Sequence, residues 1–92
     1  MKQLKIVITS RFKKDYKDLI KRGRNPELLQ QVISTLTKGE KLPEKYKDHV
    51  LVGNWVGYRE CHIQPDWLLI YKVQDNILVL LLARTGSHSD LF

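Results

Sequence analysis

The chain has 92 residues, enough for one domain with a single core, and we expect residues 1–92 to form that domain. It carries 16 Lys and Arg against 10 Asp and Glu, and its longest apolar run, 77–83, is far below the roughly 20 residues that span a bilayer. The lone cysteine, Cys61, excludes an internal disulfide, so we expect a soluble, cytoplasmic protein.

The N-terminal half predicts one strand followed by two helices. Apolar residues alternate over 4–8, which indicates a strand half-buried against the core. Thr9-Ser10 can cap a helix that Gly23 ends, and Asn25-Pro26 can start a second helix that Gly39 ends. We expect the two helices to form an antiparallel hairpin that covers one face of a sheet.

The first helix carries most of the positive charge. Residues 1–24 hold nine basic and two acidic side chains, whereas residues 25–92 hold seven basic and eight acidic ones. A one-sided basic surface is typical of proteins that bind polyanions, although a solvated helix that aids solubility explains the charge equally well. The lysines predicted to face water are Lys13, Lys14, Lys17 and Lys21.

The C-terminal half predicts strands. A polar loop over 41–48 is followed by a weak strand at 50–54 and by stronger strands at 58–63, 67–73 and 77–84. A tight turn at 74–76 joins the last two, and the continuous apolar run of 77–83 is typical of a central strand. The fold class is therefore α+β, with a mostly antiparallel sheet packed on the helical hairpin.

All three histidines lie in this half, at His49, His62 and His88. Imidazole, whose ordinary pKa is about 6.5, exchanges protons near neutrality. Strand alternation places Tyr58, Glu60 and His62 on one face, and Asp66 follows His62 after a turn, where its carboxylate can fix the His62 tautomer. Spacing alone does not show that the three rings converge.

Such a cluster suits metal-independent cleavage of RNA. One imidazole takes the proton of a ribose 2′-hydroxyl that attacks the adjacent phosphate, and a second acid protonates the departing 5′-oxygen. Arg59 or Arg84 can stabilise the charge on phosphorus oxygens, and Trp67 or Phe92 can stack on nucleobases.

Each of these residues also has a structural explanation. His62 can be a packed strand residue, Trp67 can belong to the core, and the arginines can pair with nearby carboxylates. Three histidines can also bind zinc, but their separations lack the short spacing of such sites. Cys61 faces away from His62 and is expected to be a buried thiol.

Two stretches resemble a known family. Residues 46–71, YKDHVLVGNWVGYRECHIQPDWLLIY, and the ending RTGSHSDLF at 84–92 are similar to the YafQ branch of the RelE toxin superfamily. The order strand–helix–helix–strands fits a RelE-like fold across essentially the whole chain. The departures are small, at Val50 and Cys61, and neither touches the expected chemistry.

The resemblance implies a toxin of a type II toxin–antitoxin pair, a ribosome-dependent endoribonuclease that cuts mRNA and needs no cofactor or metal. It implies acid–base and phosphate-handling roles for His49, His62, Asp66 and His88, and substrate-shaping roles for Trp67 and Phe92. It also implies a cognate acidic antitoxin that is expected to be a ribbon-helix-helix DNA-binding protein. Two alternatives stay open, a non-catalytic ribosome-binding module and a gyrase-inhibiting toxin of the same fold.

Overall fold

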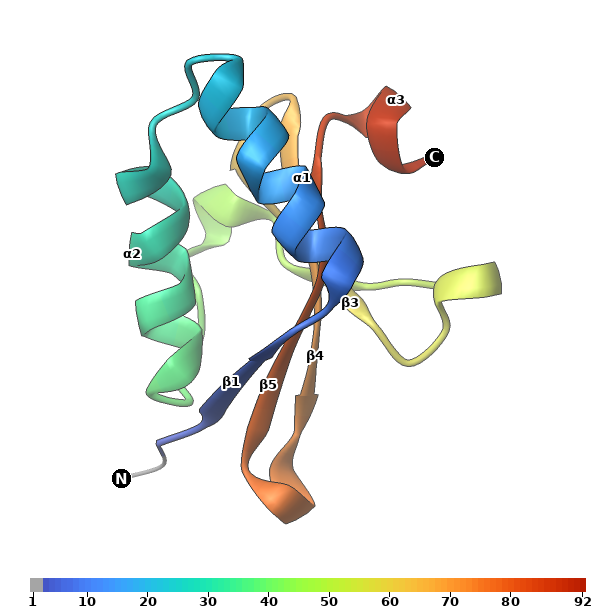
Figure 1. The fold of residues 1–92 in the computed structure, drawn as a ribbon. Helices are drawn as coiled ribbons and strands as arrows, with labels where there is room; N and C mark the ends of the chain where they lie inside the picture. Colours follow the sequence, from blue (N-terminus) through green and yellow to red (C-terminus); the bar gives the residue numbers. More distant parts are fainter. Residues whose placement is uncertain (1–2) are drawn as a thin grey trace.

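The computed structural model describes residues 3–92, which fold around a five-stranded sheet of order β1-β5-β4-β3-β2 (Figure 1). The strands are β1 (Lys5–Ile8), β2 (His49–Val50), β3 (Arg59–Gln64), β4 (Trp67–Gln74) and β5 (Val79–Gly86). The α-helices are α1 (Ser10–Lys21), α2 (Pro26–Thr37) and α3 (His88–Leu91), and the short 3-10 turns are η1 (Glu44–Tyr46), η2 (Gly53–Trp55) and η3 (Asp75–Ile77). The α+β class is confirmed.

Both predicted helix starts are confirmed by side-chain caps. The Thr9 hydroxyl accepts a hydrogen bond from the Phe12 amide at 3.0 Å, and the Asn25 side chain accepts one from the Glu27 amide at 3.0 Å. Both helices also stop where glycine was expected to stop them, with Gly23 at φ +82° and Gly39 at φ +74° just beyond the last helical residues.

The sheet is mostly antiparallel, as predicted, because only β1 and β5 run parallel. β1 is an edge strand, and here the expected half-burial is only partly met. Ile6 and Ile8 stay 44% and 43% exposed, since β1 has a neighbour on one side only. The continuous apolar run forms β5, an interior strand between β1 and β4.

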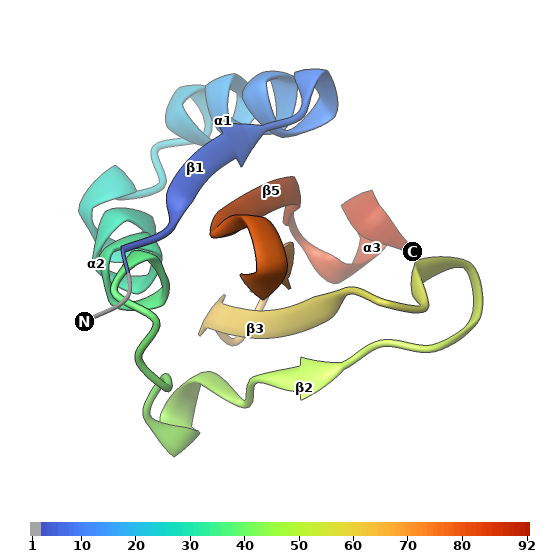
Figure 2. The same cartoon turned by 90° about the horizontal axis from the view of Figure 1, so that it is seen from below.

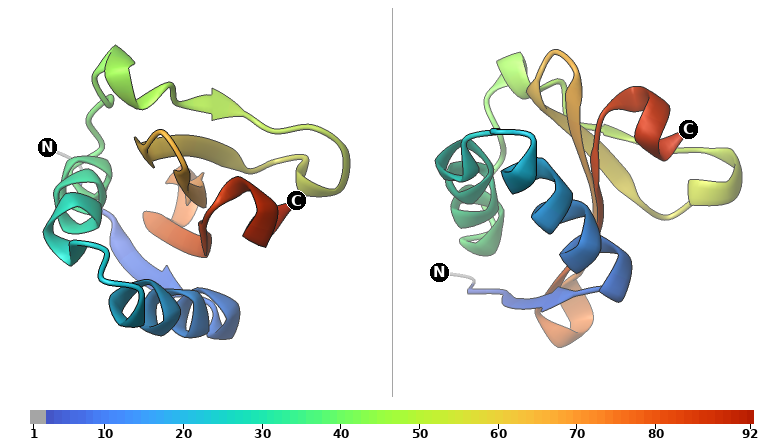
Figure 3. Two further views of the ribbon diagram at one scale, coloured as in Figure 1. Left: turned by 90° about the horizontal axis from the view of Figure 1, so that it is seen from above. Right: turned by 45° about the horizontal axis from the view of Figure 1, so that its top comes forward.

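The sheet has two differently covered faces. On one face Leu69 and Tyr71 of β4 pack with the apolar residues of α1 and α2, forming the main core. On the other face Leu68 and Ile70 pack with Leu91 of α3 in a smaller cluster. Figures 2 and 3 show α2 and α3 on opposite sides of the central strands. The histidine-bearing face of β3 is the one that carries α3.

Two predicted segments differ in extent. The weak strand over 50–54 is only the two-residue β2, after which the chain enters η2. The turn before β5 is longer than expected, because η3 and a left-handed Leu78 (φ +52°) use residues that the apolar pattern assigned to the strand. No helix within residues 3–92 is long and apolar enough to cross a membrane.

Candidate active site

Sheet pairing brings two of the three histidines together. β2 runs antiparallel to β3 and sets His49 directly opposite Glu60, while His62 follows Glu60 on the same face of β3. The His49 and His62 ring centroids are 6.3 Å apart. Their Nε2 atoms lie 3.4 Å and 3.8 Å from the same Glu60 carboxylate oxygen, Oε1. A carboxylate therefore lies between the two imidazoles.

Glu60 is the component that the sequence prediction did not assign to the site. It is 5% exposed, and its second oxygen, Oε2, is buried without a hydrogen-bond partner among residues 3–92. A buried carboxylate oxygen without a donor is costly unless a ligand or a mobile proton satisfies it. Alternation already placed Glu60 beside His62, but its pairing with His49 required the register of β2.

The backbone of Lys47 holds the ring of His49. His49 Nδ1 lies 2.7 Å from the Lys47 carbonyl oxygen, and because a carbonyl only accepts, Nδ1 must carry the proton. Lys47 adopts a left-handed conformation (φ +50°), which is uncommon for a residue with a side chain. The remaining nitrogen, Nε2, lies 3.4 Å from Glu60 Oε1, so the imidazole and the carboxylate are placed to pass a proton between them.

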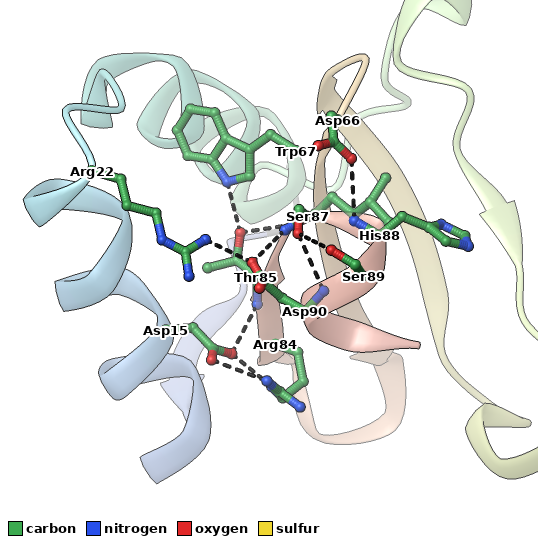
Figure 4. Close-up of polar contacts among 11 residues, drawn as sticks. Asp15, Arg22, Asp66, Trp67, Arg84, Thr85, Ser87, His88, Ser89 and Asp90 are labelled. Atoms are coloured by element: carbon green, nitrogen blue, oxygen red, sulfur yellow. Dashed lines mark hydrogen bonds and ion pairs between the residues drawn. The ribbon is translucent and has the colours of Figure 1, made fainter.

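The third histidine belongs to a separate group at the start of α3. His88 donates its backbone N–H to Asp66 Oδ1 at 3.3 Å, and its ring centroid lies 5.1 Å from that of Phe92. Phe92 is 53% exposed. In Figure 4 the His88 ring points away from the polar network that fixes the helix, which leaves its nitrogens facing outward.

The two histidine groups flank one row of the sheet. His62 pairs with Leu68, and Leu68 pairs with Gly86, so the three residues lie side by side on adjacent strands. Neighbouring strands are 4.7–4.9 Å apart, which puts the backbones of His62 and Gly86 about 10 Å apart. His88 lies in α3, whose Leu91 packs with Leu68 and Ile70, so both histidine groups lie on the same face of the sheet.

A polar network ties α3 to α1. Ser87 and Asp90 form a capping box, and Asp90 Oδ2 also accepts a hydrogen bond from Arg22 at 2.8 Å (Figure 4). The Arg22 hydrogen bond, followed by those from Ser87, lowers the pKa of Asp90 to about 2. About two turns earlier, on α1, Asp15 accepts from Arg84 at 2.7 Å and from the Thr85 amide at 3.2 Å.

The structure corrects two predictions. The expected partnership of His62 with Asp66 is wrong, because Asp66 binds the His88 backbone while Glu60 is the carboxylate beside His62. The expected stacking surface on Trp67 is also wrong. Trp67 is 1% exposed, and its indole N–H donates to Thr85 Oγ1 at 2.9 Å within the core.

The two arginines are committed to carboxylates outside the histidine groups. The Arg59 Nε lies 3.3 Å from both oxygens of Asp48, on the helix-facing side of β3, and its side chain is 40% exposed. Arg84 pairs with Asp15 and its side chain is only 15% exposed, so Arg84 connects β5 to α1. Neither guanidinium touches His49, His62 or His88.

The remaining predicted residues fall into two sets. The four lysines of α1 are all exposed, and no carboxylate pairs with any of them within residues 3–92. Cys61 is fully buried on the opposite face from His62, and burial raises the pKa of its thiol. In the described part of the chain, no three or more His, Cys, Asp and Glu side chains gather closely enough to hold a metal ion.

The fold and the paired histidine groups agree with a class of small bacterial toxins. Residues 4–92 match the profile of the family described as the bacterial toxin of type II toxin–antitoxin system, YafQ. The "mRNA interferase toxin YafQ" of Escherichia coli K12 is 41% identical over 93 residues, which cover 100% of this chain and 99% of the relative. The chain belongs to the YafQ toxin family.

Solved structures agree with this membership. A metal-bound toxin from Helicobacter pylori has a TM-score of 0.92 at 43% identity and covers 98% of this chain and 100% of its own. The toxin of the E. coli DinJ-YafQ toxin–antitoxin complex has a TM-score of 0.89 at 41% identity, with 98% of each chain covered. The RelE-like fold expected from the sequence is confirmed.

Proposed function

We propose that the protein is an endoribonuclease toxin that cuts mRNA on the ribosome and thereby stops translation. One observation carries the proposal: two imidazoles 6.3 Å apart share a buried carboxylate, with a third histidine across the same surface. Groups of this kind exchange protons near neutrality. The activity in the name of the E. coli relative, which matches along the whole chain, supports the same reaction.

In the proposed reaction, the His49–Glu60–His62 group takes the proton from a ribose 2′-hydroxyl, with both imidazoles as proton-transfer groups and the Glu60 carboxylate between them. The 2′-oxygen bonds to the adjacent phosphorus as the bond to the 5′-oxygen breaks. His88 protonates that leaving oxygen, and the products are a 2′,3′-cyclic phosphate and a 5′-hydroxyl. Asp66 holds the start of α3, and exposed Phe92 offers a stacking face next to His88.

The partners follow from the charge distribution. The exposed lysines of α1 form a basic surface that suits ribosomal RNA, and the same surface suits an acidic antitoxin segment. A relative is solved in complex with an antitoxin, DinJ, which supports a cognate antitoxin here, and the family resemblance favours the ribbon-helix-helix type. We infer that the protein acts in the cytoplasm, where translation takes place.

A translation extract programmed with a defined message tests the proposal. The parental protein should cut the message with or without chelator and leave a 2′,3′-cyclic phosphate end. His62→Ala and His88→Ala should each reduce the cleavage rate on the order of 10²- to 10⁴-fold, because each removes a proton-transfer group. Glu60→Gln should cause a smaller loss, since it keeps the shape of the site but removes the negative charge and the carboxylate's capacity to take up a proton.

Asn76→Ala is the control, because Asn76 is exposed at the far end of the β4–β5 hairpin. It should cut like the parental protein. If both histidine variants cut at the parental rate, the catalytic assignment is wrong. Ribosome binding without cleavage would point instead to a non-catalytic module, and inhibited DNA supercoiling without cleavage would point to a gyrase-directed toxin.

A further inference from the structure

A pocket of about 470 Å³ lies beside His62 and takes no part in the proton transfers proposed above. It lies where β3 extends beyond the short β2, between the second helix and the turn η1. Its walls come from Leu28 and Gln31 of α2, from η1, and from the end of β3. This volume is within the range of pockets that hold small ligands or single groups of a larger one.

The pocket combines an aromatic ring with aliphatic walls. Tyr46 is half-buried and packs against the main core, while Leu28 and Ile63 supply apolar surface beside it. Lys45 Nζ lies 5.1 Å from the centroid of the Tyr46 ring. An exposed cation–π contact is weaker than stacking of a nucleobase, so a flat ring can displace this ammonium.

Two amides provide hydrogen-bonding groups at fixed positions. Arg24 donates to Gln64 Oε1 at 2.7 Å, and because arginine only donates, this contact settles which way the Gln64 amide is turned. Its NH₂ group is left with two donors that bind nothing within residues 3–92. The side chain of Gln31 is likewise without a hydrogen bond in the described chain and offers both a donor and an acceptor.

The rim of the pocket is positively charged. Lys45 and Lys47 both line it, and no carboxylate pairs with either ammonium among the described residues. Unpaired lysines next to a stacking ring favour a ligand that joins a flat base to a phosphate.

Two residues connect the pocket to the His49–Glu60–His62 group. His62 lines the pocket and also lies beside Glu60, and Lys47 lines it while its carbonyl holds the His49 ring. A nucleotide whose phosphate lies at these histidines therefore has its neighbour's base within reach of Tyr46.

We propose that this pocket binds the nucleobase of the nucleotide adjacent to the scissile linkage, stacked on Tyr46 and held at its edge by Gln64 and Gln31. The assignment rests on the proposed ribonuclease function and adds a determinant of where the message is cut. The base occupies the pocket, Lys45 and Lys47 neutralise the flanking phosphate, and the catalytic histidines meet the linkage beside it.

Binding can be tested without cleavage. The full-length ¹⁵N-labelled protein is titrated with an RNA trinucleotide that carries a 2′-O-methyl group at the central ribose, which blocks the attack. The side-chain amide signals of Gln31 and Gln64 should shift, while that of Gln30, on the same helix but outside the pocket, should not. Three further trinucleotides each lack the base at one position. Only one of the three should fail to shift the amide signals, namely the one that lacks the base bound in the pocket. Unchanged amide signals up to millimolar ligand, or shifts that survive loss of every base, would overturn the proposal.

Cleavage gives a second test in the translation extract. Removing the base at the sensitive position should lower kcat/KM of the parental protein roughly 5- to 150-fold, the size expected from lost base stacking. Tyr46→Leu, which keeps apolar volume against the core, should start from a lower kcat/KM and lose little more when the base is removed. Tyr16→Leu is the matched control, since Tyr16 is half-buried against the same core on α1.

The two proposals fail in different ways. If Tyr46→Leu loses as much as the parental protein on base removal, the pocket does not hold the base, although the histidine chemistry stands. If His62→Ala cuts at the parental rate, the catalytic assignment fails, although the amide shifts still report whether the pocket binds a nucleobase.

Discussion

At the scale of single residues, Trp67 separates packing from recognition. Its indole lies in the main core under Arg24, 5.7 Å from the ring centroid, and bonds to Thr85. Because no face of the ring is open, it cannot stack on a nucleobase without unfolding its surroundings. The position of Trp67 at the start of a strand, next to the carboxylate of Asp66, suggested a role in substrate binding. Its packing in the core excludes that role.

This placement predicts a stability effect without a binding effect. Trp67→Phe should lower the free energy of unfolding by about 1–3 kcal/mol, from a smaller ring and a lost hydrogen bond. In a Trp55→Phe background, the emission of Trp67 should resist acrylamide and stay unchanged when 2′-O-methyl RNA binds. Quenching of Trp67 by the RNA would show that its ring meets the substrate.

The separation of the two histidine groups predicts their distinct roles. If His88 protonates the leaving 5′-oxygen, an RNA with sulfur in place of that oxygen needs no acid, because a thiolate is a far better leaving group. His88→Ala should regain most of the parental rate on this substrate, whereas His49→Ala should not. Single-turnover cleavage of oxygen and sulfur substrates measures the effect, and rescue of the His49 variant alone would reverse the assignment.

Whether a site residue or contact could be predicted from the sequence depends on how far along the chain its interaction partner lies. His49, His62 and His88 stand out by their chemistry, and alternation ties Glu60 to His62 within one strand. The role of Glu60 depends on pairing with β2, a two-residue strand whose pattern is too short to fix a register. The Asp15–Arg84 pair joins residues 69 apart and leaves no periodic signal at all.

At the scale of elements, the features set by local sequence were predicted correctly, whereas those set by tertiary contacts were not. The caps at Thr9 and Asn25 and the glycine stops fix both helices within the sequence that forms them. The extent of β5 was shifted by two residues, because η3 and the left-handed Leu78 depend on how the hairpin meets β1, where the Lys5 amide bonds to Leu78. Exposure of β1 likewise depends on its place at the sheet edge.

The element that carries His88 is held from outside its own sequence. A four-residue helix has little stability of its own, so α3 relies on its capping box, on Leu91 and on the Arg22–Asp90 ion pair. Arg22→Gln should loosen α3, raise amide exchange at 88–91 and lower the cleavage rate. Lys38→Gln, the same charge change on an exposed residue beyond α2 and away from the basic surface of α1, should do neither.

The same contact predicts a pH dependence for α3. The pKa of Asp90 is depressed from 3.8 to about 2 in the folded protein, so its charged form is the stabilising one. That contribution is fully present above pH 3.8 and is lost as the pH falls through about 2. The protection factors of the amides at 88–91, obtained by NMR between pH 5 and 2 after division by the intrinsic exchange rate at each pH, should therefore fall at the acid end, and Arg22→Gln should move this fall to higher pH.

At the scale of the whole molecule, charge and chemistry are separated in space. The basic helix α1 packs on β5 from one side of the sheet, whereas the histidines lie on the face that carries α3. Contacts from α1 to Arg84, Thr85 and Asp90 nevertheless join the two sides. A partner that covers α1 therefore blocks binding to the ribosome directly. It can affect the histidine groups only through these contacts.

The separation predicts that recruitment and chemistry respond to different substitutions. The double variant of Lys14→Gln and Lys17→Gln should weaken ribosome binding and lower the slope of log Kd against log salt by about 1.5, the share expected for two lost phosphate contacts. The double variant of Lys38→Gln and Lys41→Gln makes the same charge change elsewhere and should leave the slope unchanged. Because neither pair touches the histidine groups, the cleavage rate at saturating ribosomes should stay at the parental value for both. Equal slopes for the two double variants would mean that net charge, and not the surface of α1, directs the protein to the ribosome.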